Sequence, residues 1–97
     1  MPALRWLPEA LEDVERLHSF LAEISPGAAR RAAAAILAGA DHLAEHPRIG
    51  RPLGDGRREW FAPFGVGAYV LRYRLDENGN PVVVRVWHSR EQRGGSG

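Results

Sequence analysis

The sequence contains no cysteine, no lysine and no long apolar run. Without cysteine there is neither a disulfide framework nor a thiolate metal site, which agrees with a reducing compartment. No apolar run has the length of a membrane span, and the N-terminus lacks a signal-peptide pattern. We therefore expect a cytoplasmic protein. Its 97 residues are enough for one domain with one modest hydrophobic core.

All 13 basic residues are arginine, and the charges are unevenly distributed along the chain. Acidic side chains predominate in the first 24 residues, whereas residues 48–93 contain nine arginines. Arginine is well suited to bidentate contacts with carboxylates and phosphates. A charge asymmetry of this kind indicates a negatively charged partner more clearly than the net charge of +1 does.

Residues 67–90 carry the clearest local pattern. Two runs of alternating apolar and polar residues flank Asn78-Gly79, and an Asn-Gly pair in this setting is typical of a tight β-hairpin turn. With these two residues as the turn, the predicted cross-strand pairs are Leu75–Val82, Tyr73–Val84, Leu71–Val86 and Tyr69–His88, with Arg72 directly opposite Arg85. Because strand residues alternate between faces, this register divides the hairpin into an apolar and a basic face.

The apolar face of the predicted hairpin is expected to be core, and it comprises Tyr69, Leu71, Tyr73, Leu75, Val82, Val84 and Val86. The opposite face comprises Val70, Arg72, Arg74, Val83, Arg85 and Trp87. Like charges placed directly opposite each other are unfavourable unless solvent or an anion relieves them. A solvated outer face is the simplest alternative. Arginine beside an aromatic residue is, however, typical of interface centres, so we predict a binding face.

Two helices are predicted before this hairpin. Pro8 fits the first position of one helix, and Ser25-Pro26 provides an N-cap and first turn for a second helix over about residues 26–45. Their short connection predicts an antiparallel helical hairpin. Residues 3–7 and 57–61 are predicted strands. The expected fold is α+β, in the order β-α-α-β-β-β, with the helical hairpin packed on one face of a mostly antiparallel twisted sheet.

An ordered set of short motifs resembles a known family. The set comprises Trp6-x-Pro8-Glu9-Ala10, Ser25-Pro26, Ala28-Ala29-Arg30, His46-Pro47-x-Ile49-Gly50-Arg51-Pro52, Arg58-Glu59, Tyr69-x-x-x-Tyr73-Arg74 and Val86-Trp87-His88-Ser89-Arg90. Together they resemble the RelE/ParE superfamily of bacterial type II toxin–antitoxin toxins, in particular the ParE, or plasmid-stabilisation, branch. The resemblance predicts a single toxin domain over residues 1–93, with residues 94–97 as a flexible tail or linker.

The resemblance implies a toxin that a cognate antitoxin neutralises in a hetero-oligomeric complex. It leaves two activities open. ParE-like members poison DNA gyrase, whereas RelE-like members cut mRNA on the ribosome; a degenerate member would only bind its antitoxin. We expect the gyrase-binding activity, because the tyrosine found near the C-terminus of RNA-cleaving members is missing here.

The candidate residues differ between these activities. A nuclease would use His88 as base or acid, with Glu59 assisting and Arg72, Arg74, Arg85 and Arg90 holding phosphate. An antitoxin- or target-binding surface would contain Arg58, Arg72, Arg74, Val83, Arg85, Trp87, His88 and Arg90. His42 and His46 have the spacing of zinc ligands on a helix, but the sequence offers no third ligand beside them. We therefore predict no metal and no cofactor.

Overall fold

The two predicted helices are confirmed. The computed structural model describes residues 3–91, so the predicted tail at 94–97 lies outside the described residues. Helix α1 spans Pro8–Ile24 and α2 spans Pro26–Glu45, each with proline in its first turn. The Ser25 hydroxyl accepts a hydrogen bond from Ala28 N–H at 3.2 Å, which is the predicted N-cap. Neither helix is long and apolar enough to cross a bilayer.

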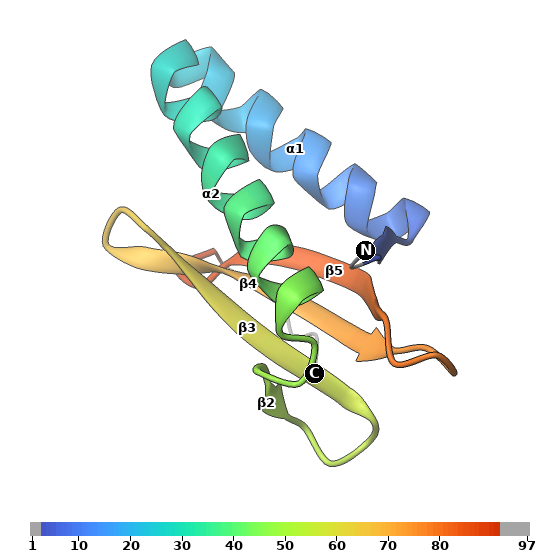
Figure 1. The fold of residues 1–97 in the computed structure, drawn as a ribbon. Coiled ribbons are helices and arrows are strands. Elements are labelled where there is room, and N and C mark those ends of the chain that lie inside the picture. Colours follow the sequence, from blue (N-terminus) through green and yellow to red (C-terminus); the bar gives the residue numbers. More distant parts are fainter. Residues whose placement is uncertain (1–2, 92–97) are drawn as a thin grey trace.

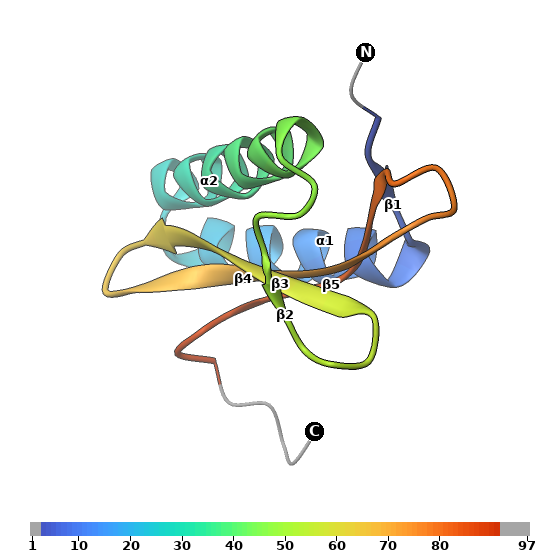
Figure 2. The same cartoon turned by 60° about the horizontal axis from the view of Figure 1, so that its bottom comes forward.

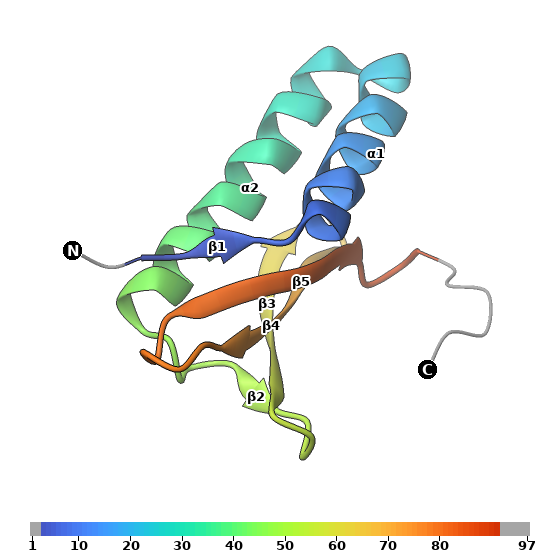
Figure 3. The same cartoon turned by 90° about the vertical axis from the view of Figure 1, so that its right-hand side faces the viewer.

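Within residues 3–91, five strands form a single sheet below the helical hairpin (Figure 1). They are β1 (Arg5–Trp6), β2 (Arg51–Pro52), β3 (Arg57–Phe64), β4 (Gly67–Leu75) and β5 (Pro81–His88), in the spatial order β1-β5-β4-β3-β2. Strand β1 is parallel to β5 and the other pairs are antiparallel. The predicted α+β architecture is therefore confirmed, with β1 and β2 at opposite edges of the sheet (Figure 3).

The additional strand β2 was not predicted. Its residues Arg51 and Pro52 lie in the segment that the sequence predicts as a loop, and they pair with Glu59 and Arg58 of β3. A strand this short has no periodicity to detect, because it forms only where the loop passes the edge of β3. The twisted β3–β4 hairpin runs through the middle of the molecule (Figure 2).

The core lies between the helical hairpin and one face of the sheet. Its buried cluster contains Ala10, Leu17, Ala32, Ile36, Ala40, Leu43, Ala62, Tyr69, Leu71, Tyr73, Val83 and Val86. The predicted core positions of Tyr69 and Tyr73 are confirmed, with 2% and 0% of their surfaces exposed. Ile24, an apolar residue at the end of α1, is nevertheless 71% exposed. It ends α1 where the helical hairpin projects beyond the sheet (Figure 1).

The predicted register of β4 and β5 is correct for one half of the hairpin. Tyr69 pairs with His88, Leu71 with Val86, and Arg72 with Arg85. Between Arg72 and Tyr73 the register shifts by one residue, so Tyr73 pairs with Val83 and Leu75 with Pro81. A β-bulge of this kind inserts an extra residue into one strand and reverses the alternation beyond it. Val83 is consequently core and not part of the basic face.

The turn between β4 and β5 is longer than predicted. Asp76 N–H donates to Asn80 O at 2.8 Å, and Gly79 N–H donates to Asp76 O at 2.9 Å. The Asp76 carboxylate also accepts hydrogen bonds from the N–H groups of Asn78 and Asn80, both at 2.9 Å. Gly79 has a φ of +80°, which favours glycine. Asn78-Gly79 is thus part of a wider turn organised by Asp76.

Candidate functional site

The face of the sheet away from the helices carries rows of charged residues. We call it the outer face. Cross-strand pairing places Arg51, Glu59, Arg72 and Arg85 in one row, and Arg57 and Arg74 with Val82 in the next. Paired residues of neighbouring strands point to the same side of the sheet. The predicted basic face therefore exists, but it includes the carboxylate of Glu59.

Glu59 is held between two arginines of its row. Arg72 donates to Glu59 Oε2 from Nε at 2.9 Å and from a terminal nitrogen at 2.6 Å, while Arg51 donates to Oε1 at 3.0 Å. Glu59 is only 5% exposed. The guanidinium of Arg72 also lies over the Trp87 ring, with 4.9 Å to its centroid. Trp87 is itself 8% exposed. These groups form an internal network.

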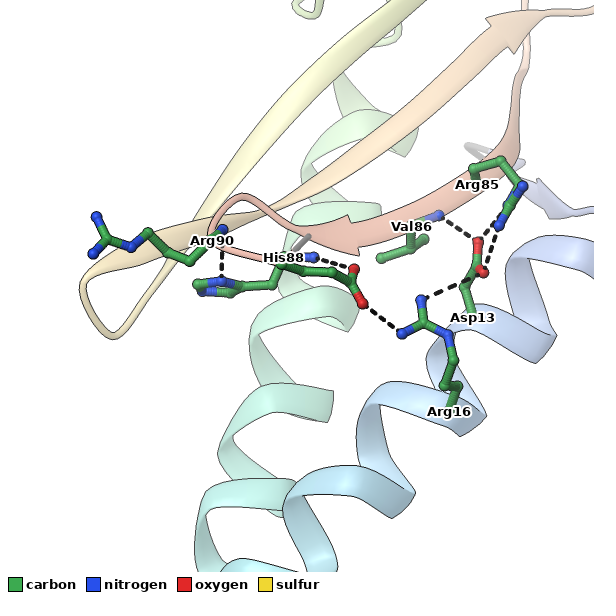
Figure 4. Close-up of polar contacts among 7 residues, drawn as sticks. Asp13, Arg16, Arg85, Val86, His88 and Arg90 are labelled. Carbon is green, nitrogen blue, oxygen red and sulfur yellow. Dashed lines mark hydrogen bonds and ion pairs between the residues drawn. The ribbon is translucent and has the colours of Figure 1, made fainter. Parts of the chain in front are cut away.

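Arg85 is bound by a carboxylate of α1 (Figure 4). Asp13 accepts hydrogen bonds from Arg85 Nε at 2.7 Å, from a terminal nitrogen of Arg85 at 3.1 Å and from Val86 N–H at 2.9 Å. Arg16 lies 3.7 Å from the same carboxylate. Burial alone raises the pKa of Asp13, but the bonds from Arg85 and Val86 and the charges of both arginines outweigh it, so the pKa is lowered.

Both ring nitrogens of His88 form hydrogen bonds with backbone groups. Its Nε2 lies 3.1 Å from Phe64 O, and its Nδ1 accepts a hydrogen bond from Arg90 N–H at 3.2 Å. Because Nδ1 is the acceptor, Nε2 carries the proton that is donated to Phe64 O. The backbone N–H of His88 donates to Glu91, whose carboxylate also pairs with Arg16. His88 therefore holds the end of β5 against the β3–β4 turn.

Arg58, another predicted binding residue, stabilises the loop between α2 and β3. Its guanidinium donates to Arg48 O at 2.9 Å and to Gly50 O at 2.8 Å. The Tyr73 hydroxyl donates to Pro47 O at 2.7 Å and accepts from Gly50 N–H at 2.8 Å. A Cβ atom at Gly50 would lie 2.5 Å from that hydroxyl. The His46–Pro52 motif thus has a structural explanation.

Two of the predicted arginines have exposed side chains that form no hydrogen bond or ion pair with the described residues, although the charge of Arg74 helps to lower the pKa of Asp76. Arg74 projects from β4 on the outer face, and Arg90 follows β5. The predicted site residues therefore do not form one cluster. Val83 and Trp87 are buried, Arg58, Arg72, Arg85 and His88 have internal partners, and Arg74 and Arg90 are accessible.

An apolar groove of about 710 Å³, not predicted from the sequence, lies between α1 and the β3–β4 turn. Its lining comprises Arg16, Leu17, Phe20, Leu21, Phe64, Gly65, Val66, Tyr69, His88, Arg90 and Glu91. Phe20 is 64% exposed and Val66 is 85% exposed. A sequence signal was limited to Phe20, a large aromatic residue that directly follows the polar pair His18-Ser19. We call this the α1 groove.

The chain is similar to several bacterial toxins. It shows 46% identity over 85 residues to Toxin RelE1 of Caulobacter vibrioides, covering 87% of this chain and 89% of that toxin. Identity to Toxin RelE3 of the same organism is 38% over 86 residues, covering 89% of this chain and 92% of the relative. A solved structure described as the chromosomal ParDE TA system from P. aeruginosa matches the fold, with a TM-score of 0.71, 20% identity, and coverage of 91% of this chain and 96% of that chain.

Residues 4–93 match the family described as ParE toxin of type II toxin-antitoxin system, parDE. This match extends over nearly the whole chain, and it agrees with the fold, the relatives and the ordered motifs. The chain therefore belongs to the ParE family and is the toxin of a type II toxin–antitoxin system.

Proposed function

We propose that this toxin acts in the cytoplasm by binding DNA gyrase and blocking its cycle, and not by cleaving RNA. One observation carries the proposal: both ring nitrogens of His88 are engaged by the backbone groups of Phe64 and Arg90. RNA cleavage through the 2′-hydroxyl needs a general base that is free to accept a proton and a general acid that donates a proton to the leaving oxygen. His88 would have to break a bond that holds the end of β5 before it could exchange a proton.

Two of the arginines that a nuclease would use to bind phosphate are already paired with carboxylates of this chain. Arg72 and Arg85 each bind a carboxylate of this chain, and Glu59 is bound by two arginines. A phosphate would have to displace these carboxylates. A protein-binding surface has no such requirement, because it needs complementary shape and charge without a proton-transfer group. We assign the gyrase contact to the outer face around Arg74, which is exposed and forms no hydrogen bond or ion pair within the described residues.

We assign the α1 groove to the cognate antitoxin. The groove combines exposed apolar side chains, Phe20 and Val66, with the cationic groups of Arg16 and Arg90 at its rim. Exposed apolar surface bordered by charged residues is typical of an interaction site. A segment with apolar side chains and a carboxylate would complement it, because the carboxylate can pair with the guanidinium of Arg90, which forms no hydrogen bond or ion pair within the described residues.

A RelE-like mRNA endoribonuclease is the second candidate, favoured by the relatives named RelE toxins. In that activity Arg74 and Arg90 would contact phosphate, and His88 would act after release from Phe64. A chain that only binds its antitoxin is the third candidate. The three candidates predict different results in two assays on the purified toxin, so the assays distinguish them directly.

The experiment combines supercoiling and cleavage-complex assays on purified gyrase with primer extension on translated mRNA. We expect loss of supercoiling, stabilised cleavage complexes and intact mRNA. Arg74→Gln should reduce gyrase inhibition, whereas Arg30→Gln, which removes an exposed arginine of α2, should not. Cut mRNA with unaffected gyrase would replace this proposal with the nuclease. Inactivity in both assays, together with antitoxin binding, would support the degenerate toxin.

A further inference from the structure

Two histidines at the C-terminal end of α2 lie side by side. His42 is in the last turn of the helix, and His46 is its C-cap residue. Residues four apart are neighbours on a helix surface. Their ring centroids are 4.9 Å apart, and the ring planes are inclined by 52°. The rings are therefore adjacent without being stacked face to face.

The ring nitrogens of both residues are available. Within residues 3–91, neither imidazole forms a hydrogen bond or an ion pair. The two rings contact each other, and the His42 ring also contacts Trp60. His88 is the opposite case, since its two ring nitrogens are both engaged. Available imidazole nitrogens are common ligands for Zn²⁺, Cu²⁺ and Ni²⁺.

The pair is also held on a rigid base. The His42 ring stacks on Trp60 of β3, with 5.0 Å between centroids and 29° between planes. His46 N–H donates to His42 O at 2.9 Å, and Ile49 N–H donates to His46 O at 3.1 Å. The following carbonyl, that of Pro47, is bound by the Tyr73 hydroxyl. Side chains on well-packed elements lose less conformational freedom when they bind a metal ion.

We propose that His42 and His46 form a two-imidazole site for a late first-row divalent ion. Metal–nitrogen bonds of about 2.0–2.1 Å allow one ion to bridge two rings at this separation. Cu²⁺ binds most tightly among such ions, and imidazole ligands without carboxylates disfavour Mg²⁺ and Ca²⁺. No third histidine, cysteine or acidic side chain joins the pair within the described part of the chain, so the remaining positions take water and the ion exchanges readily.

This site is separate from the surfaces assigned to gyrase and antitoxin, and its test does not depend on them. The full chain is titrated with Cu²⁺ while tryptophan fluorescence is recorded. Because His42 stacks on Trp60, a bound Cu²⁺ ion quenches the emission of that tryptophan. We expect saturable quenching with one ion per chain. His42→Ala and His46→Ala should each weaken binding by at least about tenfold, the loss that even outer-shell changes cause at metal sites.

The matched control is His18→Ala, which removes an exposed histidine of α1 and should leave the affinity unchanged. A second measurement uses Zn²⁺, which should raise the Tm of the wild-type chain and leave that of His46→Ala unchanged, because a ligand stabilises only the state that binds it. Circular dichroism confirms that the variants fold. Quenching that does not saturate, or equal Cu²⁺ affinity in the wild type and both His42→Ala and His46→Ala, would overturn the proposal.

Discussion

Arg72 and Arg85 lie directly opposite each other on β4 and β5, yet their guanidinium groups bind carboxylates of different elements. Arg72 reaches Glu59 on β3, whereas Arg85 reaches Asp13 on α1. The repulsion expected between the two cations is therefore relieved within the chain. An external anion is not required for this relief, so the accessible charge on the outer face is smaller than the number of arginines suggests.

We predict that Asp13→Asn destabilises the fold. The change removes the charge that Arg85 contacts and weakens the acceptor of Val86 N–H at the edge of β5. Loss of a charged hydrogen-bond partner at a buried position costs about 1–3 kcal/mol. Urea denaturation at pH 7 measures the free energy of unfolding. Glu15→Gln, on the exposed side of α1, is the control and should have little effect.

The contribution of Asp13 should depend on pH. Its pKa is lowered in the folded state, so the unfolded chain, with an ordinary pKa of about 3.9, binds the proton more readily. The stabilisation is therefore present above that value and is lost as pH falls through the folded-state pKa. We expect the difference in unfolding free energy between the wild type and Asp13→Asn to shrink below about pH 4. A difference that is constant from pH 7 to pH 2 would contradict this account.

We predict that the Tyr73 hydroxyl contributes more to the stability of the fold than the Tyr69 hydroxyl does. Tyr73→Phe removes the bonds to Gly50 N–H and Pro47 O, leaving buried backbone groups unpaired at a cost of about 1–3 kcal/mol. Tyr69 lies on the same strand and face, but its hydroxyl bonds to no described residue, so Tyr69→Phe is the matched control. Thermal unfolding of both variants provides the comparison. Equal Tm values for the two would show that the hydroxyl does not stabilise the loop.

We predict that Gly50→Ala disturbs the same loop for a steric reason. The added Cβ would lie 2.5 Å from the Tyr73 hydroxyl, which is closer than such atoms approach. The combination with Tyr73→Phe still leaves ring atoms within 3 Å, so the double variant should recover little of the lost Tm. Calorimetry of the two single variants and the double variant tests this point. Full recovery in the double variant would assign the clash to the hydroxyl alone.

We predict that Phe20→Ser weakens antitoxin binding without loss of stability. Phe20 is 64% exposed and lines the α1 groove, so its removal affects the complex more than the free toxin. A central aromatic contact is often worth about 2 kcal/mol or more in an interface. Isothermal titration with the cognate antitoxin measures the affinity. Leu37→Ser, 58% exposed on α2 and outside the groove, is the control; equal affinities for both variants would contradict the assignment of the groove.

We predict that antitoxin affinity falls as salt is added, because exposed ion pairs are screened. Arg90 at the rim of the α1 groove should contribute to this dependence. Titrations of wild type and Arg90→Gln at several salt concentrations should show a smaller salt effect in the variant. Arg30→Gln, at a residue that does not line the groove, should behave like the wild type. Salt-independent binding of the wild type would exclude an electrostatic contribution.

The helices and half of the hairpin register follow from local sequence signals. Pro8 and Ser25-Pro26 define helix starts through short-range chemistry, and the structure confirms both. The role of Asp13 was missed, because an acidic residue near a helix start already has a local explanation in the helix dipole. Its contact with Val86 spans 73 positions in the chain and depends on the free edge of β5. The binding residues were predicted from their charge and aromatic character. Their partners within the chain could not be predicted, because these partners come from distant segments that only the tertiary structure brings together.

The bulge in β5 and the long turn around Asp76 compensate for each other. The turn displaces the strand alignment by one residue, and the bulge restores it before Arg72 meets Arg85. If only the turn or only the bulge were lost, the pairing of residues 81–83 with β4 would shift by one residue. That shift would exchange the buried and exposed side chains of this segment. A two-residue turn without the bulge would give the same Arg72–Arg85 pairing but would place Val84, and not Val83, opposite Tyr73. The two irregularities together therefore decide which valine of β5 enters the core.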